Sequence, residues 1–211
     1  MKYLTGTYHY KLAGNPASVI ETFQLTKEKE KSRVTTKRVI GSGKEPTILE
    51  CLSEFSACLS SGKASFSMKN GKKHCTADFK WNRNTIQTQR QRSTTRESKT
   101  YTNLDDFIFF PLMRVFQGRL IMNIRNKSTE IYTPHLNSID DSNLFSLCKS
   151  TRISSRLDKN NTFSTIGYKV NGGPYSKEDT FWVNEDLELL TYYKTQQQGE
   201  PWSAYLEIAG K

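Results

Sequence analysis

The stretch Phe163-Ser-Thr-Ile-Gly-Tyr-Lys-Val170, followed by Asn171-Gly172-Gly173-Pro174, decides the fold. Its first part is rich in β-branched and aromatic residues, which is typical of a β-strand. Asn-Gly then supplies the positive φ angles that a tight hairpin turn requires. The sequence therefore predicts a strand that ends at the Asn-Gly pair and a hairpin partner that starts directly after it.

The same alternation of strand and turn signals continues to the end of the chain. It predicts strands at 175–183, 187–197 and 202–208, separated by polar turns at 184–186 and 198–201. With the first strand, these segments form a four-strand antiparallel meander. Because Phe181-Trp182-Val183 is apolar on both faces, we expect other parts of the chain to pack against each side of this sheet.

The N-terminal half also reads as strands joined by turns. Alternating patterns predict strands at 4–12, 19–25, 32–40, 63–69 and 72–81, and Asn70-Gly71 predicts a hairpin between the last two. Residues 47–59 are ambiguous, because their apolar residues fit either one stripe of a helix or one face of a strand. Strands on both sides favour the strand.

Length and charge limit the classes of function. The 211 residues contain no linker-like stretch, so we expect a single domain over residues 1–211. Lys and Arg total 31 against 21 Asp and Glu, and the net charge of +10 favours an anionic partner such as nucleic acid or a phospholipid surface. The N-terminus lacks the apolar segment of a signal peptide, so the location is periplasmic if a signal was removed and cytoplasmic otherwise.

Positive charge is concentrated in one polar part of the chain. Residues 80–99 hold six basic residues and one acidic residue, a net charge of +5 and half of the surplus of the whole chain. Residues 85–101 are expected to form a polar strand pair. Arg90, Arg92 and Arg96 are therefore candidates for an anion-binding face, and the alternative is an ordinary solvated face.

Residues 104–122 are the most apolar part of the sequence. Asp105 and Asp106 suit the first turn of a helix, Pro111 the start of a second, and Gly118 its end, so one or two short helices are expected. A hairpin of 120–124 with 128–133 should follow, and then a loop at 135–147 and a strand at 149–157.

The seven apolar residues from Phe107 to Met113 exceed what one buried helix stripe needs. They indicate either a core helix packed on the sheet or a lid helix in the mouth of an incomplete barrel, facing a cavity that holds an acyl chain. On the second interpretation the ligand-binding residues are Phe107, Phe109, Phe110, Met113, Phe116, Trp182 and Trp202.

No arrangement of catalytic or metal-binding residues is visible in the sequence. His9, His74 and His135 lie in different segments, and there is no phosphate-binding loop, nucleophile elbow or dinucleotide fingerprint. The four cysteines form no CxxC motif, which favours structural or free thiols over a zinc site. A disulfide between Cys51 and Cys58 is the alternative. No cofactor or metal is therefore predicted.

The long meander, the apolar segment in its middle and a set of C-terminal motifs occur together in this chain. These motifs are Tyr168-Lys-Val170, Asp179-Thr-Phe181-Trp182-Val183-Asn184-Glu185-Asp186, Leu190-Thr-Tyr192 and Trp202-Ser-Ala-Tyr205-Leu206. In these features the chain resembles the bacterial half-barrel lipid-binding proteins, which include the LolA/LolB-type lipoprotein carriers and a glycolipid-binding spiral β-roll family. The resemblance implies a curved sheet around an apolar groove, a helix across the opening, and a binding or carrier role.

The sequence thus predicts an all-β antiparallel meander, curved into a half-barrel or β-roll, with a helix across the opening. The predicted function is non-catalytic binding or transport of a hydrophobic or amphiphilic small molecule by a monomer, with an anionic membrane surface as a further partner. One alternative is an RNA or single-stranded DNA binding module, in which Trp81 and Tyr101 at the ends of the basic stretch stack on bases. Another is a lipocalin-like enzyme or lyase that acts on an apolar ligand.

Overall fold

The computed structural model describes residues 1–57, 59–150, 152–157, 165–172, 175–197 and 200–209, and within these the side chains of 175–178 and 197 are not described. Some predicted features therefore lie outside the described residues. They are Cys58 of the possible disulfide, the beginning of the strand predicted from Phe163, and the turn positions 173–174 and 198–199.

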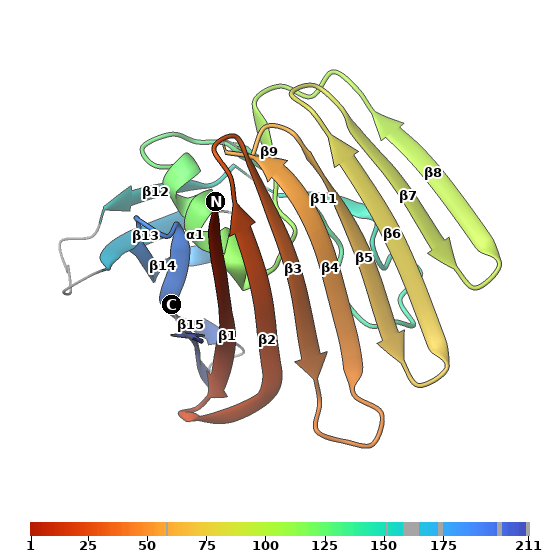
Figure 1. The fold of residues 1–211 in the computed structure, drawn as a ribbon, viewed down its shortest axis with the longest axis horizontal. Coiled ribbons are helices and arrows are strands. Elements are labelled where there is room, and N and C mark those ends of the chain that lie inside the picture. The colour runs from red at the N-terminus through yellow and green to blue at the C-terminus, as the bar shows by residue number, and fades with distance from the viewer. Residues whose placement is uncertain (58, 151, 158–164, 173–174, 198–199, 210–211) are drawn as a thin grey trace.

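One large sheet forms most of the molecule (Figure 1). It has 13 strands in the order β12-β13-β14-β15-β16-β1-β2-β3-β4-β5-β6-β7-β8, and each strand runs antiparallel to its neighbours. The N-terminal meander comprises β1 (Lys2–Leu12), β2 (Asn15–Lys27), β3 (Lys31–Ile40), β4 (Thr47–Ser56), β5 (Gly62–Asn70), β6 (Lys73–Trp81), β7 (Ile86–Arg92) and β8 (Thr95–Tyr101). The C-terminal strands are β12 (Ser154–Leu157), β13 (Ile166–Gly172), β14 (Tyr175–Asn184), β15 (Leu189–Gln197) and β16 (Glu200–Ile208).

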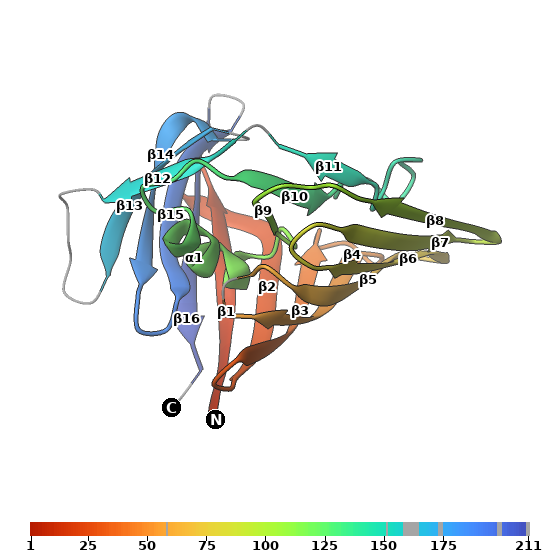
Figure 2. The ribbon, with the colours of Figure 1, turned by 90° about the horizontal axis from the view of Figure 1, so that it is seen from above.

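The first and last strands of the chain join the two meanders. β1 pairs with β16 from Gly6↔Ile208 to Leu12↔Trp202, so the first and last strands lie side by side (Figure 2). β12 and β8 form the two outer edges, and the sheet is curved but not closed. The predicted fold class, an antiparallel β meander curved into a partial barrel with one short helix, is confirmed.

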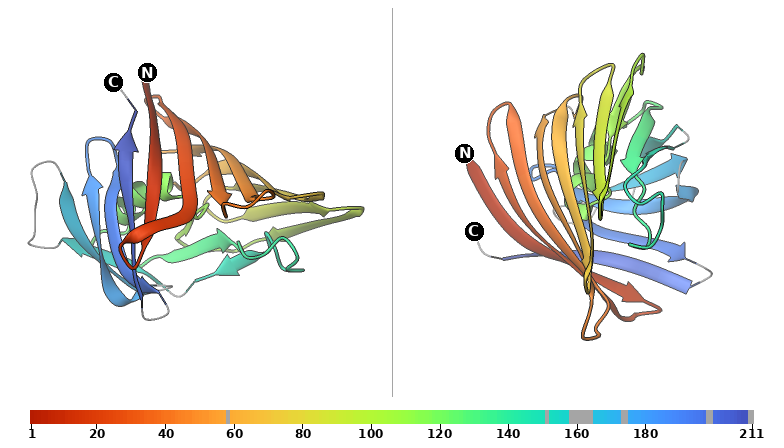
Figure 3. Two further views of the ribbon diagram at one scale, coloured as in Figure 1. Left: turned by 90° about the horizontal axis from the view of Figure 1, so that it is seen from below. Right: turned by 90° about the vertical axis from the view of Figure 1, so that its right-hand side faces the viewer.

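A helix and a small sheet fill the concave side of the large sheet (Figure 2). The helix is α1 (Arg114–Asn123), and the small sheet has the order β11-β10-β9, formed by β9 (Phe107–Phe109), β10 (Glu130–Pro134) and β11 (Leu147–Lys149). Seen from below, these elements lie between the N-terminal and the C-terminal strands of the large sheet (Figure 3, left). The core is the layer between them.

Strand alternation decides which side chains enter this core. On β2, Phe23 and Leu25 are buried against the concave side, whereas Thr22 and Gln24, which alternate with them, are exposed on the other face. The same alternation holds on β3 to β6. The outer face of the N-terminal meander is therefore polar, and its inner face is apolar.

The prediction for residues 104–134 was wrong in several places. Phe107–Phe109 is a strand rather than a helix, because it pairs in parallel with β10, with Phe107 opposite Glu130. The helix begins at Arg114, three residues after Pro111, and residues 120–123 belong to it instead of forming a hairpin strand. Hydrophobic periodicity could not reveal this, because residues 107–113 are apolar on every side.

Gly118 does not end the helix as predicted but lies in its middle. A Cβ atom on this residue would approach the backbone of Glu188, Leu189 and Leu190 to 2.6 Å. The glycine therefore lets α1 lie directly against the backbone of β15. Close helix packing, rather than helix termination, explains this residue.

Other local predictions had mixed outcomes. The ambiguous 47–59 segment is the strand β4, as favoured, and the polar 85–101 segment is the strand pair β7 and β8. The strand predicted at 149–157 is divided between β11 and β12, which belong to different sheets. Cys51 is a free thiol, so it does not form the disulfide that the sequence left open. Within the described residues, no helix has the length and apolar character needed to cross a membrane.

Candidate functional site

A cavity of about 520 Å³ lies at the end of the concave side where β1, β3 and β15 end and β2 and β16 begin. We call it the mouth cavity. The following residues line it: Tyr10, Val19, Arg38, Ile40, Phe110, Leu112, Arg114, Leu136, Tyr193, Thr195, Gln196 and Trp202. Apolar and aromatic side chains form most of this lining, and two arginines supply its charge.

Strand register places a charged pair at the floor of the mouth cavity: Arg38 lines the cavity, and the fully buried Glu21 pairs with Arg38 behind the lining. Glu21 shares the inward phase of β2 with Phe23, and Arg38 shares that of β3 with Thr36. The β2–β3 pairing sets Glu21 directly opposite Arg38. Two opposite charges are therefore forced to meet on the inner face.

Glu21 is completely buried and accepts four hydrogen bonds. Arg38 donates to one carboxylate oxygen from Nε at 3.0 Å and from Nη2 at 2.7 Å, and the Tyr10 hydroxyl donates to the same oxygen at 3.1 Å. The other oxygen accepts from the backbone N–H of Arg114 at 2.7 Å. These contacts satisfy a buried carboxylate that would otherwise be strongly destabilising.

The Glu21 carboxylate also takes the place of an N-cap for α1. Met113, at the N-cap position, makes no side-chain capping bond, and the first turn holds no acidic residue. A negative charge at a helix N-terminus satisfies free N–H groups and interacts favourably with the helix dipole. In addition, Arg38 Nη2 donates to the carbonyl of Leu112 at 2.7 Å. The sheet thereby fixes the turn that leads into the helix.

The electrostatics of this floor follow from burial and from the Glu21 charge. Burial, and then the Glu21 carboxylate, raise the pKa of Tyr10 to about 12. Burial acts to lower the pKa of Arg38, but Glu21 and Tyr10 outweigh it and raise that pKa. The guanidinium of Arg114 lies over the ring of Tyr193, 4.9 Å from its centroid. The floor therefore combines one carboxylate with two guanidinium groups.

The predicted ligand-binding residues fall into three places. Phe110 and Trp202 line the mouth cavity, and Trp202 packs on Tyr10 with ring centroids 5.7 Å apart. Trp182 is partly exposed beside Tyr192, on the opposite face of β14 from buried Phe181. The remaining four are buried core residues, and a ligand could reach them only if the core opened: Phe107, Phe109, Met113 and Phe116.

The three arginines predicted to bind anions lie on β7 and β8. Arg90 donates to the Glu97 carboxylate at 2.7 Å and to the carbonyls of Ser142 and Leu144 at 3.2 Å. Arg92 donates to two further carbonyls of the same loop, at 2.8 and 2.9 Å. Both side chains therefore tie this loop to β7, whereas Arg96 is exposed. Binding of an external anion by these residues stays a prediction.

The aromatic residues of the nucleic-acid alternative differ in exposure. Trp81 is buried and donates from Nε1 to the carbonyl of Leu59 at 3.0 Å. Tyr101 is partly exposed and packs against the core. Trp81 therefore presents no ring face on which a base could stack in this conformation.

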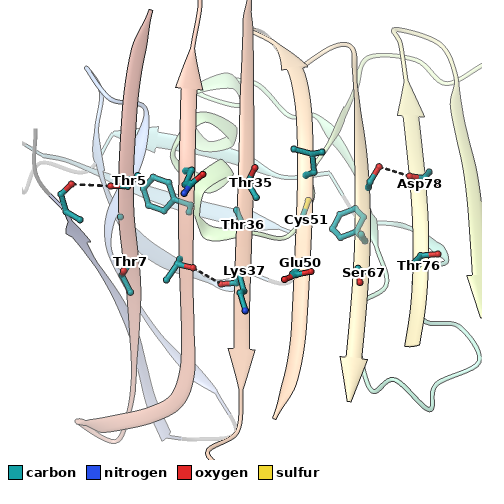
Figure 4. A pocket seen from close by; sticks show the side chains of 18 residues that line it. Thr5, Thr7, Thr35, Thr36, Lys37, Glu50, Cys51, Ser67, Thr76 and Asp78 are labelled. Carbon is teal, nitrogen blue, oxygen red and sulfur yellow. Dashed lines mark hydrogen bonds between the residues drawn. The ribbon is translucent and has the colours of Figure 1, made fainter. Parts of the chain in front are cut away.

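A second, larger hollow of about 910 Å³ lies on the outer face of β1 to β6 (Figure 4). Hydroxyl groups dominate the side chains that point into it, among them Thr5, Thr7 and Thr76. Some of its polar groups bind one another, as Ser65 Oγ donates to Asp78 Oδ1 at 2.6 Å. Small polar groups thus characterise this outer groove, whereas the mouth cavity joins aromatic rings to buried charges.

Sequence reasoning missed the charged floor of the mouth cavity, namely Glu21, Arg38 and Arg114. A signal for the first two was present, because each occupies a position in phase with buried residues of its strand. A charged residue in an apolar phase, paired across a hairpin with the opposite charge, marks an internal ion pair. Arg114 carried no such signal.

Comparison with known proteins shows similarity at the level of fold. A β-barrel-like protein of the domain of unknown function DUF1849 from Brucella abortus has a crystal structure that matches with a TM-score of 0.55. The match covers 99% of this chain and 98% of that chain at 7% sequence identity, so it shows a shared fold alone. No family model and no curated protein sequence matches the chain.

Proposed function

We propose that this protein binds an anionic amphiphile in the mouth cavity without chemically changing it. The observation that carries this proposal is the lining of that cavity, where Phe110, Leu136 and Trp202 provide apolar surface beside Arg38 and Arg114. A volume of about 520 Å³ falls within the usual range for small-molecule sites, about 300–1,000 Å³. A half-barrel lipid carrier of the LolA/LolB type is the finer form of this proposal, and the β-barrel-like fold supports it.

The charge of the floor favours an anionic headgroup. Arg38 pairs with Glu21, and Arg114 adds a second guanidinium to the same floor, where its Nη1 donates to Gln117 Oε1 at 2.5 Å. A carboxylate, sulfate or phosphate group can accept hydrogen bonds from a guanidinium in a partly desolvated site, where such bonds are strong. The negative charge of Asp179 opposes this preference, because it lies beside the cavity. Its carboxylate accepts a hydrogen bond from Thr195, a residue of the lining, at 2.9 Å.

The test compares ligands that share one chain and differ in headgroup: dodecanoate, dodecyltrimethylammonium and dodecyl maltoside. Their dissociation constants are measured by displacement of an anilinonaphthalene sulfonate probe and by tryptophan fluorescence. We expect dodecanoate to bind most tightly. Tighter binding of the cationic ligand, or no binding of any of the three, would overturn the proposal.

Matched variants locate the site. Arg114→Gln should weaken dodecanoate binding roughly tenfold, because a hydrogen bond to a charged group contributes about 1.5–3 kcal/mol, and should leave the maltoside unaffected. Trp202→Ala should weaken all ligands that bind. The controls are Arg33→Gln, on the exposed outer face, and Trp182→Ala, away from the cavity. Equal effects of the controls and the cavity variants would place binding elsewhere.

A further inference from the structure

Three reactive side chains meet where the loop after β10 returns to β11, and none of them is among the residues that line the mouth cavity. The Cys148 Sγ atom lies 3.7 Å from His135 Nδ1, and His135 Nε2 lies 2.9 Å from Asp141 Oδ2. The pairing of β10 with β11 sets Thr133 opposite Cys148. The end of the loop that follows β10 therefore lies beside its beginning. Residues that are separate in the sequence thus form a line of thiol, imidazole and carboxylate.

Asp141 is held firmly as the outer member of this line. Its carboxylate also accepts from the Asn143 backbone N–H at 2.8 Å and from Asn137 Nδ2 at 3.0 Å. The Asn143 bond, followed by those from His135 and Asn137, lowers the pKa of Asp141 to about 2. It is therefore an ionised acceptor, so Nε2 of the imidazole carries the proton that lies between them. In the neutral imidazole, Nδ1 then presents its lone pair to Cys148.

The thiol needs such a base. Burial raises the pKa of Cys148, and a hydrogen bond with the Ser146 side chain opposes this only in part. Cys148 is therefore a neutral thiol at rest and loses its proton only to a group that accepts it during reaction. It is also partly exposed, whereas Cys51 and Cys75 are buried, with 1% and 5% of their surface exposed.

The same geometry does not suit a metal ion. The thiol and the carboxylate contact opposite nitrogens of the imidazole, so the donors point along a line and do not converge on one point. Among the described residues, no group of three His, Cys, Asp or Glu side chains is placed to hold a metal. A nucleophile with a base and an orienting acid is the arrangement that fits.

We propose that His135, oriented by Asp141, activates Cys148 to accept an acyl group from an acyl thioester or an activated acyl ester. Cys148 Sγ attacks the acyl carbon while its proton passes to His135 Nδ1. The bond between the acyl carbon and the leaving oxygen or sulfur breaks, and the leaving group takes the proton from Nδ1. The product is a thioester on Cys148 with no net oxidation or reduction. This site is independent of the proposed ligand binding.

The experiment uses para-nitrophenyl acetate and the full chain with Cys58→Ser, so that a thiol outside the described residues does not contribute. Nitrophenolate release gives the rate, and mass spectrometry of the intact protein and its peptides locates the acetyl group. We expect acetylation of Cys148, unchanged by Cys75→Ser and abolished by Cys148→Ser. Acetyl groups on other residues at a comparable rate would overturn the proposal.

The role of the base is tested separately. His135→Ala should slow acetylation on the order of 100-fold, within the range for general base catalysis, and free imidazole in the buffer should restore part of the rate. Circular dichroism checks the fold, and His135→Gln replaces the alanine variant if that one does not fold. Asp141→Asn should slow the reaction and Asp141→Glu should recover part of it. An unchanged rate in the His135 variant, or no response to imidazole, refutes the assignment.

Discussion

Replacing Glu21 by glutamine should destabilise the fold far more than its single-atom change suggests. The carboxylate is fully buried and accepts four hydrogen bonds, two from Arg38, one from Tyr10 and one from the backbone of Arg114. Glutamine offers one acceptor oxygen and turns two N–H donors toward groups that are themselves donors. It also leaves the Arg38 charge buried without its counter-ion.

Removal of one partner of a buried ion pair typically costs about 3–5 kcal/mol. For a chain of this size, each kcal/mol lowers Tm by roughly 2–4 °C, so Glu21→Gln should lower Tm by roughly 10 °C or more. Thermal and urea unfolding followed by circular dichroism measure the loss. The matched control is Glu54→Gln, because Glu54 pairs with Lys63 at 3.0 Å on the exposed face and such pairs contribute about 0–1 kcal/mol.

A double-mutant cycle separates the ion pair from other effects of the substitution. If the two side chains act together, Glu21→Gln and Arg38→Gln combined should cost clearly less than the sum of the single changes. Strict additivity, or a loss for Glu21→Gln no larger than that of the Glu54 control, would refute the view that this carboxylate organises the floor of the cavity and the start of α1.

Three further outcomes follow from the packing and charges. Gly118→Ala should destabilise the fold by about 1–3 kcal/mol in urea unfolding, because the added methyl group would lie 2.6 Å from the β15 backbone. Alanine is the better helix former, so a gain in stability would contradict this packing. Arg92→Gln should speed amide hydrogen exchange in the loop whose carbonyls it binds, whereas exposed Arg96→Gln should not, and equal rates would count against the anchoring role. The pKa of Asp141 is lowered from an ordinary value of 3.8 to about 2 in the folded protein, so its contribution to stability is present above pH 3.8 and is lost as the pH falls through about 2. Asp141→Asn should therefore flatten this part of an acid unfolding titration followed by fluorescence.

The sequence predicted the strands well because two local signals agree along most of the chain. Period-two alternation marks the buried face of β2 to β6. Asn-Gly pairs mark hairpin turns, and their glycines, Gly71 and Gly172, have φ angles of +55° and +98°. The segment at 107–123 carried neither signal. Its strand exists only because β10 lies beside it, and its helix starts where a carboxylate from a distant strand binds the backbone.

The candidate site was predictable only in part, for a related reason. Phe110 and Trp202 stand out as large aromatic residues in apolar or strand contexts, and both line the mouth cavity. The triad of Cys148, His135 and Asp141 gave no sequence signal, since its geometry depends on how the loop after β10 returns to β11. Local patterns determine the faces of strands, whereas the contacts that a loop makes depend on how the complete fold returns its two ends to each other.

The pairing of β1 with β16 has a consequence for how the molecule folds. Every other neighbouring pair in the N-terminal meander closes a short hairpin, whereas this seam joins residues such as Thr7 and Glu207 across nearly the whole chain. Loop closure over that distance carries a larger entropic cost and slows folding. During synthesis, the edge of β1 stays without its partner until the last strand emerges. The centre of the finished sheet is thus the last part of it to form. Until then, a chaperone or a competing strand can bind the unpaired edge of β1.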